Sequence, residues 1–372
     1  MLSIRPALTS TITVLAVFVF LQFAVFSHCC PAQDDGNAHS GPAEIECPAS
    51  DGDNIAITVA VTDKSGRPIA GLEAADFKVF DNKQPQKILA FRAVDTAHPP
   101  AVPLKVQFVI DAVNSDALLV AQERDGLSAF LRQNPGKLVD STSIWILENS
   151  GLIRIAGPSQ DGAALLTGLN GAPALLRVIN RSAGTWGDVE RTGQATKLIK
   201  EMISPDSGTP GRKLILFLSP GWPLLFRYEA DQPSLIFDDI VKISNGLRES
   251  CISLYTLDPS NVGRTFQPFS SGISDSSAYQ SFLKGVTKSR DAQYADLSLQ
   301  VLSEHSGGQV IINGNDIKTG IDTALLDAST WYNLVFERAP GGRTTEYHAI
   351  HVTVDKPGAR IRTTAGYYVS GP

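Results

Sequence analysis

The amino-acid sequence predicts an α/β fold in which a mostly parallel sheet carries helices on both faces, with β-rich segments contributed by both termini. Apolar runs typical of strands buried on both faces lie at residues 106–110, 143–147, 213–218, 252–257 and 309–312. Helix-like segments alternate with these runs, at residues 116–132, 161–169, 189–203, 234–249, 292–305 and 317–327. Strands that alternate with helices form a parallel sheet. Residues 152–156, reached through a short turn, are predicted as an antiparallel edge strand.

The segments on either side of this region have the pattern of antiparallel strands. Ile55, Ile57, Val59 and Val61 alternate with small or polar residues, as in a strand with one buried face. Further short strands are predicted at residues 77–80, 87–91, 331–336, 346–354 and 360–369. Because three short strands cannot close a core alone, we expect the two terminal segments to pack on each other, with flanking of the central sheet as the alternative. The predicted boundaries are 54–98 for the N-terminal β-rich segment, 104–329 for the α/β domain and 330–372 for the C-terminal β-rich segment.

The N-terminus has the features of an export signal. Arg5 precedes an apolar stretch at residues 12–26, and Cys30-Pro31-Ala32 then supplies small residues where a signal peptidase cuts. We predict a signal peptide at residues 1–32, followed by a flexible linker at residues 33–53 that lacks hydrophobic periodicity. An uncleaved membrane anchor is the alternative. Both interpretations predict export, to a secreted or periplasmic location.

Cysteine and charge content narrow the chemistry. Cleavage of the signal leaves Cys47 and Cys251, which an oxidising compartment can join in a disulfide; the alternative is that Cys251 is an unpaired, buried small residue. The 32 Lys and Arg residues against 38 Asp and Glu residues give a net charge of -6. No basic cluster is dense enough to neutralise a run of phosphates. We therefore expect no nucleic-acid partner, and no membrane insertion once the signal is removed.

Several segments carry a family resemblance. This chain resembles the exported von Willebrand factor A-related proteins of the Acidobacterial type in the segments DKSGRPIAGL (63–72), PQKI (85–88), LYTLDP (254–259) and AGYY (365–368). The resemblance covers most of the chain after the predicted signal. It implies that residues 104–329 form a Rossmann-like von Willebrand A-type domain.

The resemblance also implies a metal site at the carboxyl ends of the strands. In this family an Asp-x-Ser-x-Ser loop, a Thr from a second loop and an Asp from a third supply the oxygen ligands that Mg²⁺ prefers. Carried over residue by residue, the pattern assigns Asp111, Ser115 and Thr192 as metal ligands. Val113 and Pro220 stand where further ligands belong, and neither has a side-chain oxygen. We therefore expect a degenerate site and no cofactor, with Mg²⁺ as the alternative if water completes its shell.

Each of these residues also has an interpretation without a metal. Asp111 can cap the following helix or accept hydrogen bonds from the N–H groups of its own loop. Thr192 can be an ordinary helix N-cap, and Thr185 is the less favoured choice for the second loop.

The sequence offers little of the machinery of a hydrolase. No Gly-x-Ser-x-Gly turn follows any predicted strand. Ser219 follows the strand at 213–218, but Pro220 comes next and has no backbone N–H to contribute to an oxyanion hole. His305 ends a predicted helix, where we expect it to act as a cation at the helix C-terminus rather than as a general base. We expect no enzymatic activity, with an envelope hydrolase that uses Ser219 as the alternative.

The expected contact surface lies at the carboxyl ends of the strands, where ligands bind to open α/β sheets. Asn114 belongs to the first loop, Trp222 and Phe226 to an apolar loop, and residues 259–290 form a long polar stretch. Aromatic anchors commonly dominate protein interfaces, although Trp222 has the alternative of packing beneath the 259–290 stretch. The sequence thus predicts an exported binding protein whose strand-end face recognises a protein or glycan, with a metal-dependent adhesion domain as the alternative.

Overall fold

The structure is a computed structural model that describes residues 54–173, 184–206, 211–222, 224, 232–259, 275–312, 314, 316–338 and 343–369. The chain divides into two units, Met1–His39 and Ser40–Pro372, and every described residue belongs to the second. The predicted signal peptide and linker lie outside the described residues, as do Cys47 and Phe226. None of the helices within the described ranges has both the length and the apolar character needed to cross a bilayer.

The central element is a six-stranded sheet. Its strands follow the order β10 (Gln309–Ile312), β9 (Ile252–Asp258), β8 (Lys213–Leu218), β5 (Lys105–Asp111), β6 (Lys137–Glu148) and β7 (Gly151–Asp161). The first five run parallel, whereas β7 pairs antiparallel with β6. Every residue of β8 and of β9 is buried, as expected for strands covered on both faces. The predicted fold class is confirmed.

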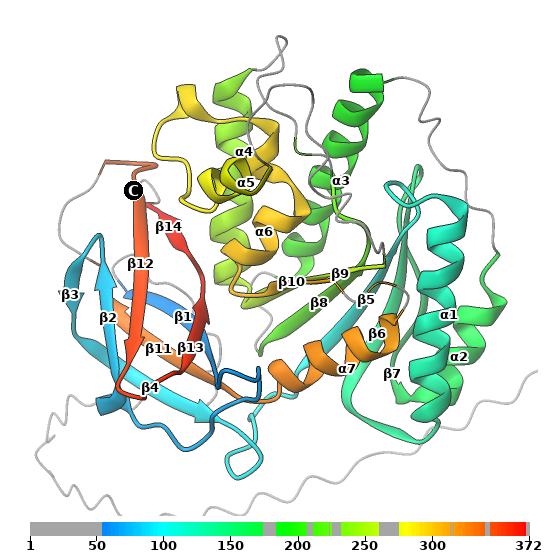
Figure 1. Ribbon diagram of the computed structural model, residues 1–372, viewed down its shortest axis with the longest axis horizontal. Coiled ribbons are helices and arrows are strands. Elements are labelled where there is room, and N and C mark those ends of the chain that lie inside the picture. Colours follow the sequence, from blue (N-terminus) through cyan, green and yellow to red (C-terminus); the bar gives the residue numbers. More distant parts are fainter. Residues whose placement is uncertain are drawn as a thin grey trace, which may run out of the picture. The chain divides into compact units, whose positions relative to one another are not determined.

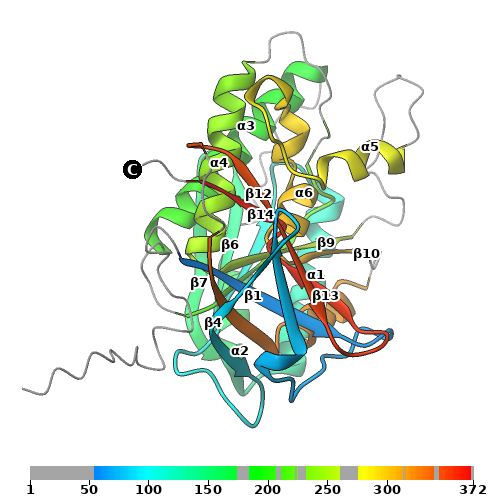
Figure 2. The ribbon, with the colours of Figure 1, turned by 90° about the vertical axis from the view of Figure 1, so that its left-hand side faces the viewer.

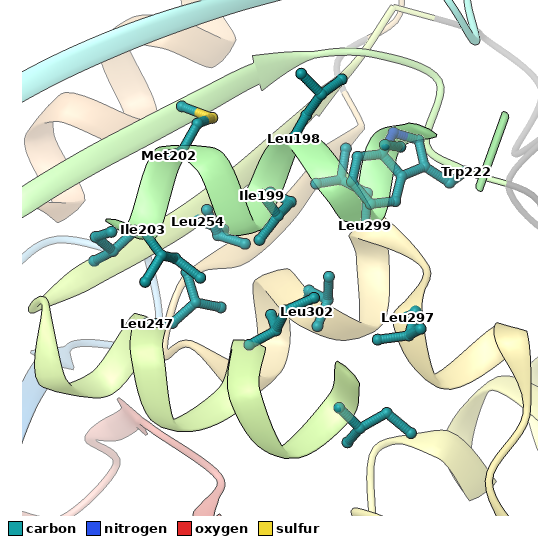
Figure 3. Close-up of a cluster of buried hydrophobic side chains, with 14 of the residues drawn as sticks. Leu198, Ile199, Met202, Ile203, Trp222, Leu247, Leu254, Leu297, Leu299 and Leu302 are labelled. Atoms are coloured by element: carbon teal, nitrogen blue, oxygen red, sulfur yellow. The ribbon is translucent and has the colours of Figure 1, made fainter. Parts of the chain in front are cut away.

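Helices cover both faces of this sheet (Figure 1). On one face lie α1 (Ala117–Gln133), α2 (Gly162–Gly171) and α7 (Ile317–Asp327). On the other face lie α3 (Gly184–Asp206), α4 (Pro233–Glu249) and α6 (Leu299–His305). Figure 3 shows Leu198 of α3, Leu247 of α4 and Leu302 of α6 in one buried cluster, with Trp222 at its edge. This cluster joins the second layer of helices to the sheet.

Two predicted elements differ from the structure. The helix expected at residues 292–305 is broken into a 3-10 turn, Tyr294–Leu297, and the shorter α6, because Ser298 between them has an extended backbone. The stretch expected to be a loop, residues 259–290, contains α5 (Asp275–Phe282) and begins a second 3-10 turn, Ser289–Asp291. Polar composition concealed both short helices, since neither has a long apolar stripe.

The two terminal β-rich segments join in one sandwich of two four-stranded sheets (Figures 1 and 2). The first sheet has the order β13 (Arg360–Thr363), β1 (Asn54–Thr62), β11 (Trp331–Glu337), β4 (Ile88–Val94). The second has the order β14 (Gly366–Tyr368), β12 (Tyr347–Val354), β2 (Phe77–Asp81), β3 (Gln84–Gln86), with a 3-10 turn, Ala74–Asp76, ahead of β2. Each sheet contains strands from both ends of the chain, so neither segment has a complete core without the other. This is the arrangement favoured by the sequence.

Tyr368 of β14 connects the sandwich to the α/β domain. The Asn245 side chain on α4 donates to the Tyr368 carbonyl at 2.8 Å and accepts from its N–H at 3.0 Å. The Tyr368 ring meets Phe237 edge-on, with centroids 5.6 Å apart, and its hydroxyl donates to the Val286 carbonyl at 2.9 Å. Because the Asn245 amide pairs with both backbone groups of Tyr368, it fixes the position of β14 against α4.

A second connection is a buried polar network at the C-terminus of α7. Asp327 accepts hydrogen bonds from the Tyr255 hydroxyl of β9 and from Arg362 of β13. Arg212 stacks beside this network over the Trp331 ring, 5.0 Å from its centroid. Buried charges are tolerated when they are paired, and this pairing links α7 and β9 of the α/β domain to β13 of the sandwich.

Candidate functional site

The first and third of the predicted metal-site loops meet at the carboxyl edge of the central sheet. Asp111 is the last residue of β5, and residues 112–116 connect it to α1. Residues 219–222 follow β8, the neighbouring strand. The adjacent ends of β5 and β8 therefore bring Asp111 and Trp222 together, as the order of a parallel sheet requires.

The carboxylate of Asp111 is buried and surrounded by hydrogen-bond donors. Its Oδ1 accepts from the N–H groups of Val113 at 3.1 Å and Asn114 at 3.0 Å. Its Oδ2 accepts from the Ser219 hydroxyl at 2.8 Å and from the indole Nε1–H of Trp222 at 3.1 Å. The Asn114 side-chain amide lies within 3.2 Å of Oδ1 and 3.0 Å of Oδ2. Each oxygen thus has three donors, which is more than its two lone pairs require.

Burial raises the pKa of Asp111, and the hydrogen bonds from Asn114, Ser219 and Trp222 oppose that rise. The second interpretation offered for Asp111, an acid that satisfies its own loop, therefore matches the geometry. A cation approaching the carboxylate would have to displace the indole.

Trp222 is held in place from several sides. Its N–H donates to Gln300 Oε1 at 3.1 Å, and Gln300 Nε2 donates back to the Trp222 carbonyl at 2.9 Å. Gly221 has φ +86°, and a Cβ there would lie 2.6 Å from the Gln300 amide, so glycine is required ahead of the tryptophan. The ring packs edge-on to Phe217 and is 1% exposed. Figure 3 shows Trp222 beside the buried leucines. The expectation that Trp222 lies on a contact surface is therefore corrected: it is a buried plug.

The other two predicted ligands are engaged elsewhere. The Ser115 hydroxyl donates to Glu123 Oε1 at 2.6 Å, away from Asp111. The Thr192 hydroxyl donates to the Asp188 carbonyl at 2.9 Å, one turn earlier in α3. Thr192 is also inside α3 rather than at its N-cap, because α3 begins at Gly184. Within the described ranges, no group of three or more His, Cys, Asp and Glu side chains is arranged to hold a metal ion.

These residues do not fit a divalent cation. The place where ligand oxygens would converge on Asp111 holds an indole N–H, which is a donor and cannot coordinate a metal. The two hydroxyls that would complete the shell donate to a glutamate and to a backbone carbonyl.

Sequence reasoning missed Glu123, the acid behind this site. Glu123 is fully buried on α1, between Val120 and Leu127 on the face that packs on the sheet. Burial raises its pKa well above the ordinary value, the Ser115 hydrogen bond opposes this, and the charge of Asp111 raises it again. Its position in the sequence indicates burial, since residues at helical spacing within an apolar stripe face the core.

The remaining site residues vary in their outcome. Asn114 is almost buried and faces Asp111 rather than solvent. Cys251 is disulfide-bonded, but Cys47 lies outside the described residues, so their pairing stays a prediction. Burial lowers the pKa of His305 to about 4, which corrects the expectation of a cation at the end of α6. The buried Ser219 hydroxyl donates to Asp111 and accepts from the Gly221 N–H at 3.1 Å, which gives no support to a nucleophilic role.

We predict that Trp222→Phe, which keeps a ring but removes the N–H, will lower the free energy of unfolding by about 1–3 kcal/mol, since it leaves a buried carboxylate short of a donor. Urea unfolding measures this. Trp145→Phe is the matched control, because the Trp145 indole donates to a neutral acceptor, Ser143 Oγ, at a half-buried position. If both substitutions cost the same, the Trp222 hydrogen bond has no special role.

A second prediction concerns Glu123→Gln. Because the folded-state pKa of Glu123 is raised, wild-type stability falls as the pH rises above the ordinary glutamate value, where the unfolded chain releases its proton first. Glutamine has no proton to lose. The variant should match wild type near about pH 4 and become progressively more stable than wild type toward about pH 8. Urea unfolding across this range, with the exposed Glu190→Gln as control, checks it; a pH-independent difference would contradict it.

No family model matches the sequence, and no curated protein matches it. Among solved structures, the chain is similar to proximal thread matrix protein 1 from the mussel byssus, with a TM-score of 0.35, 11% identity, and coverage of 73% of this chain and 50% of that one. It is similar to the SpRpn10 VWA domain, with a TM-score of 0.30, 8% identity, and coverage of 60% and 97%.

A third similar structure is the pilus adhesin SpaC from Lactobacillus rhamnosus GG, with a TM-score of 0.36, 8% identity, and coverage of 80% of this chain and 48% of that one. The chain thus spans about half the length of the mussel protein and of the adhesin.

Proposed function

We propose that this chain is an exported binding protein of the von Willebrand factor A-related type, and that the carboxyl edge of its sheet recognises a protein partner without a metal ion. The hydrogen bond from Trp222 Nε1 to Asp111 Oδ2 carries the proposal. It fills the position from which a bound cation would reach a partner's carboxylate. Recognition then has to come from side chains exposed around this edge.

Three large apolar side chains around this edge are exposed. Leu118 and Leu235 are 69% and 58% exposed in the first turns of α1 and α4, and Ile312 is 51% exposed at the end of β10. All three positions follow from the topology, since α1 and α4 begin, and β10 ends, at the carboxyl edge. A protein partner could bury these side chains, since the centre of a protein interface is more apolar than its rim. We call these three residues the carboxyl-edge face.

We predict that Leu118→Asp and Leu235→Asp each reduce capture of the partner about tenfold or more. An acid in the first turn of a helix is favourable, so both variants should fold. The measurement is quantitative cross-linking of the purified mature protein to envelope extract of the producing organism. Val139→Asp is the control, because Val139 is 88% exposed near the start of β6, away from this edge.

The same assay separates the proposal from a metal-dependent adhesion domain. Capture should persist in EDTA. Loss of capture in EDTA, restored by Mg²⁺, would favour the adhesion domain, and equal capture by wild type and both Asp variants would overturn the carboxyl-edge face.

Export is the second part of the proposal and rests on the sequence of residues 1–32. We predict that the protein recovered from its native compartment begins at Gln33, because the peptidase cuts after Ala32. Mass spectrometry of the intact N-terminus tests this. A protein that retains Met1 and stays with the membrane fraction would favour the uncleaved anchor instead.

A further inference from the structure

A second candidate site lies at the opposite end of β5 from Asp111. A cavity of about 470 Å³ extends across β5, β6 and β7, and we call it the β5–β7 cavity. Its polar lining includes Lys105, Gln107, Ser141, Ser143, Arg154 and Glu201. Lys105 is six residues from Asp111 along one strand, about 20 Å away. The volume of the cavity is within the range of small-molecule sites.

The floor of this cavity is polar where a doubly covered sheet is usually apolar. Alternate residues of a strand point to the same face, and Lys105 and Gln107 occupy that face at the start of β5, whereas Val109, two residues later, is buried in the cluster beneath α3. On β6 the same face carries Ser141 and Ser143. A polar sheet face that lines a cavity of this size offers hydrogen-bonding groups to a ligand.

One end of the cavity is a preorganised aromatic and cationic pair. The Arg154 guanidinium lies over the Trp145 ring, 5.5 Å from its centroid. The Trp145 indole N–H donates to Ser143 Oγ at 3.0 Å, which fixes the ring. Stacking orients a guanidinium while leaving its N–H donors available in its plane.

The cavity carries an excess of positive charge. Lys105 and Arg154 form no ion pair with any residue in the described part of the chain. The acid on the wall, Glu201, is paired with Lys197 at 3.7 Å. Lys105 is opposite Ser141 and Arg154 is opposite Trp145, so the two cations are four positions apart along the sheet, about 13 Å.

We propose that the β5–β7 cavity binds an acidic oligosaccharide. Its carboxylates pair with Lys105 and Arg154, and its hydroxyls exchange hydrogen bonds with Ser141, Ser143 and Gln107 between them. A peptide strand would instead add along the outer edge of β7, whereas the cavity lies on the polar face of β5 and β6. The site is separate from the carboxyl-edge face, so either can fail without the other.

The test uses tetragalacturonic acid as the probe, the purified mature protein and isothermal titration calorimetry. Wild type should bind the probe, with an affinity that falls as salt is added. Arg154→Gln and Lys105→Gln should each weaken binding about tenfold or more. Arg132→Gln is the matched control, because Arg132 is exposed on α1, on the opposite face of the sheet, and it should bind as wild type does.

Two further ligands make the outcome decisive. Neutral maltotetraose should not bind. Any binding of polyglutamate should be unaffected by Arg154→Gln. The proposal is overturned if the probe fails to bind wild type, if maltotetraose binds equally well, if Arg132→Gln weakens binding as much as Arg154→Gln, or if polyglutamate competes for the same cations.

Discussion

Burying a carboxylate at the end of a central strand is costly unless donors surround it, and Asp111 is fully buried. Two backbone N–H groups, the Asn114 amide, the Ser219 hydroxyl and the Trp222 indole meet that requirement. The indole reaches it only because Gly221 permits a left-handed turn and Gln300 holds both polar backbone groups of Trp222. One buried charge therefore fixes the conformation of two loops and their contact with α6.

This arrangement changes how the carboxyl edge can work. In a metal-dependent domain, an aspartate at this position shares a cation with the partner, whereas here the protein itself supplies every group that Asp111 contacts. The Ser115 hydroxyl is also engaged within the protein, since it donates to Glu123. Under the proposed function, recognition would depend on the exposed apolar residues of α1, α4 and β10, whose contribution would be hydrophobic and insensitive to chelators.

The sandwich adds a second constraint. Because β1 lies between β13 and β11, and β12 lies between β14 and β2, the N-terminal strands cannot form their sheets until the C-terminal strands are present. Tyr368 and the network around Asp327 then connect the completed sandwich to α4 and α7. The sandwich is thereby joined to α4 and α7 by contacts between residues far apart in the chain.

The sequence by itself determined the α/β class, the positions of the strands in the central sheet, the antiparallel edge strand and the strands of both terminal segments, because burial produces hydrophobic periodicity in the local sequence. The order of the strands in each sheet came from the tertiary structure. The sequence also placed Asp111 at a strand end, and the family resemblance implied that Val113 and Pro220, which have no side-chain oxygen, stand at ligand positions. The tertiary structure alone decided that Trp222 is a plug rather than a surface anchor, that Ser115 faces Glu123, and that Ser298 interrupts a helix. These depend on which distant side chain, such as Gln300, meets a given loop, and a hydrogen bond between residues far apart in the chain leaves no periodic trace.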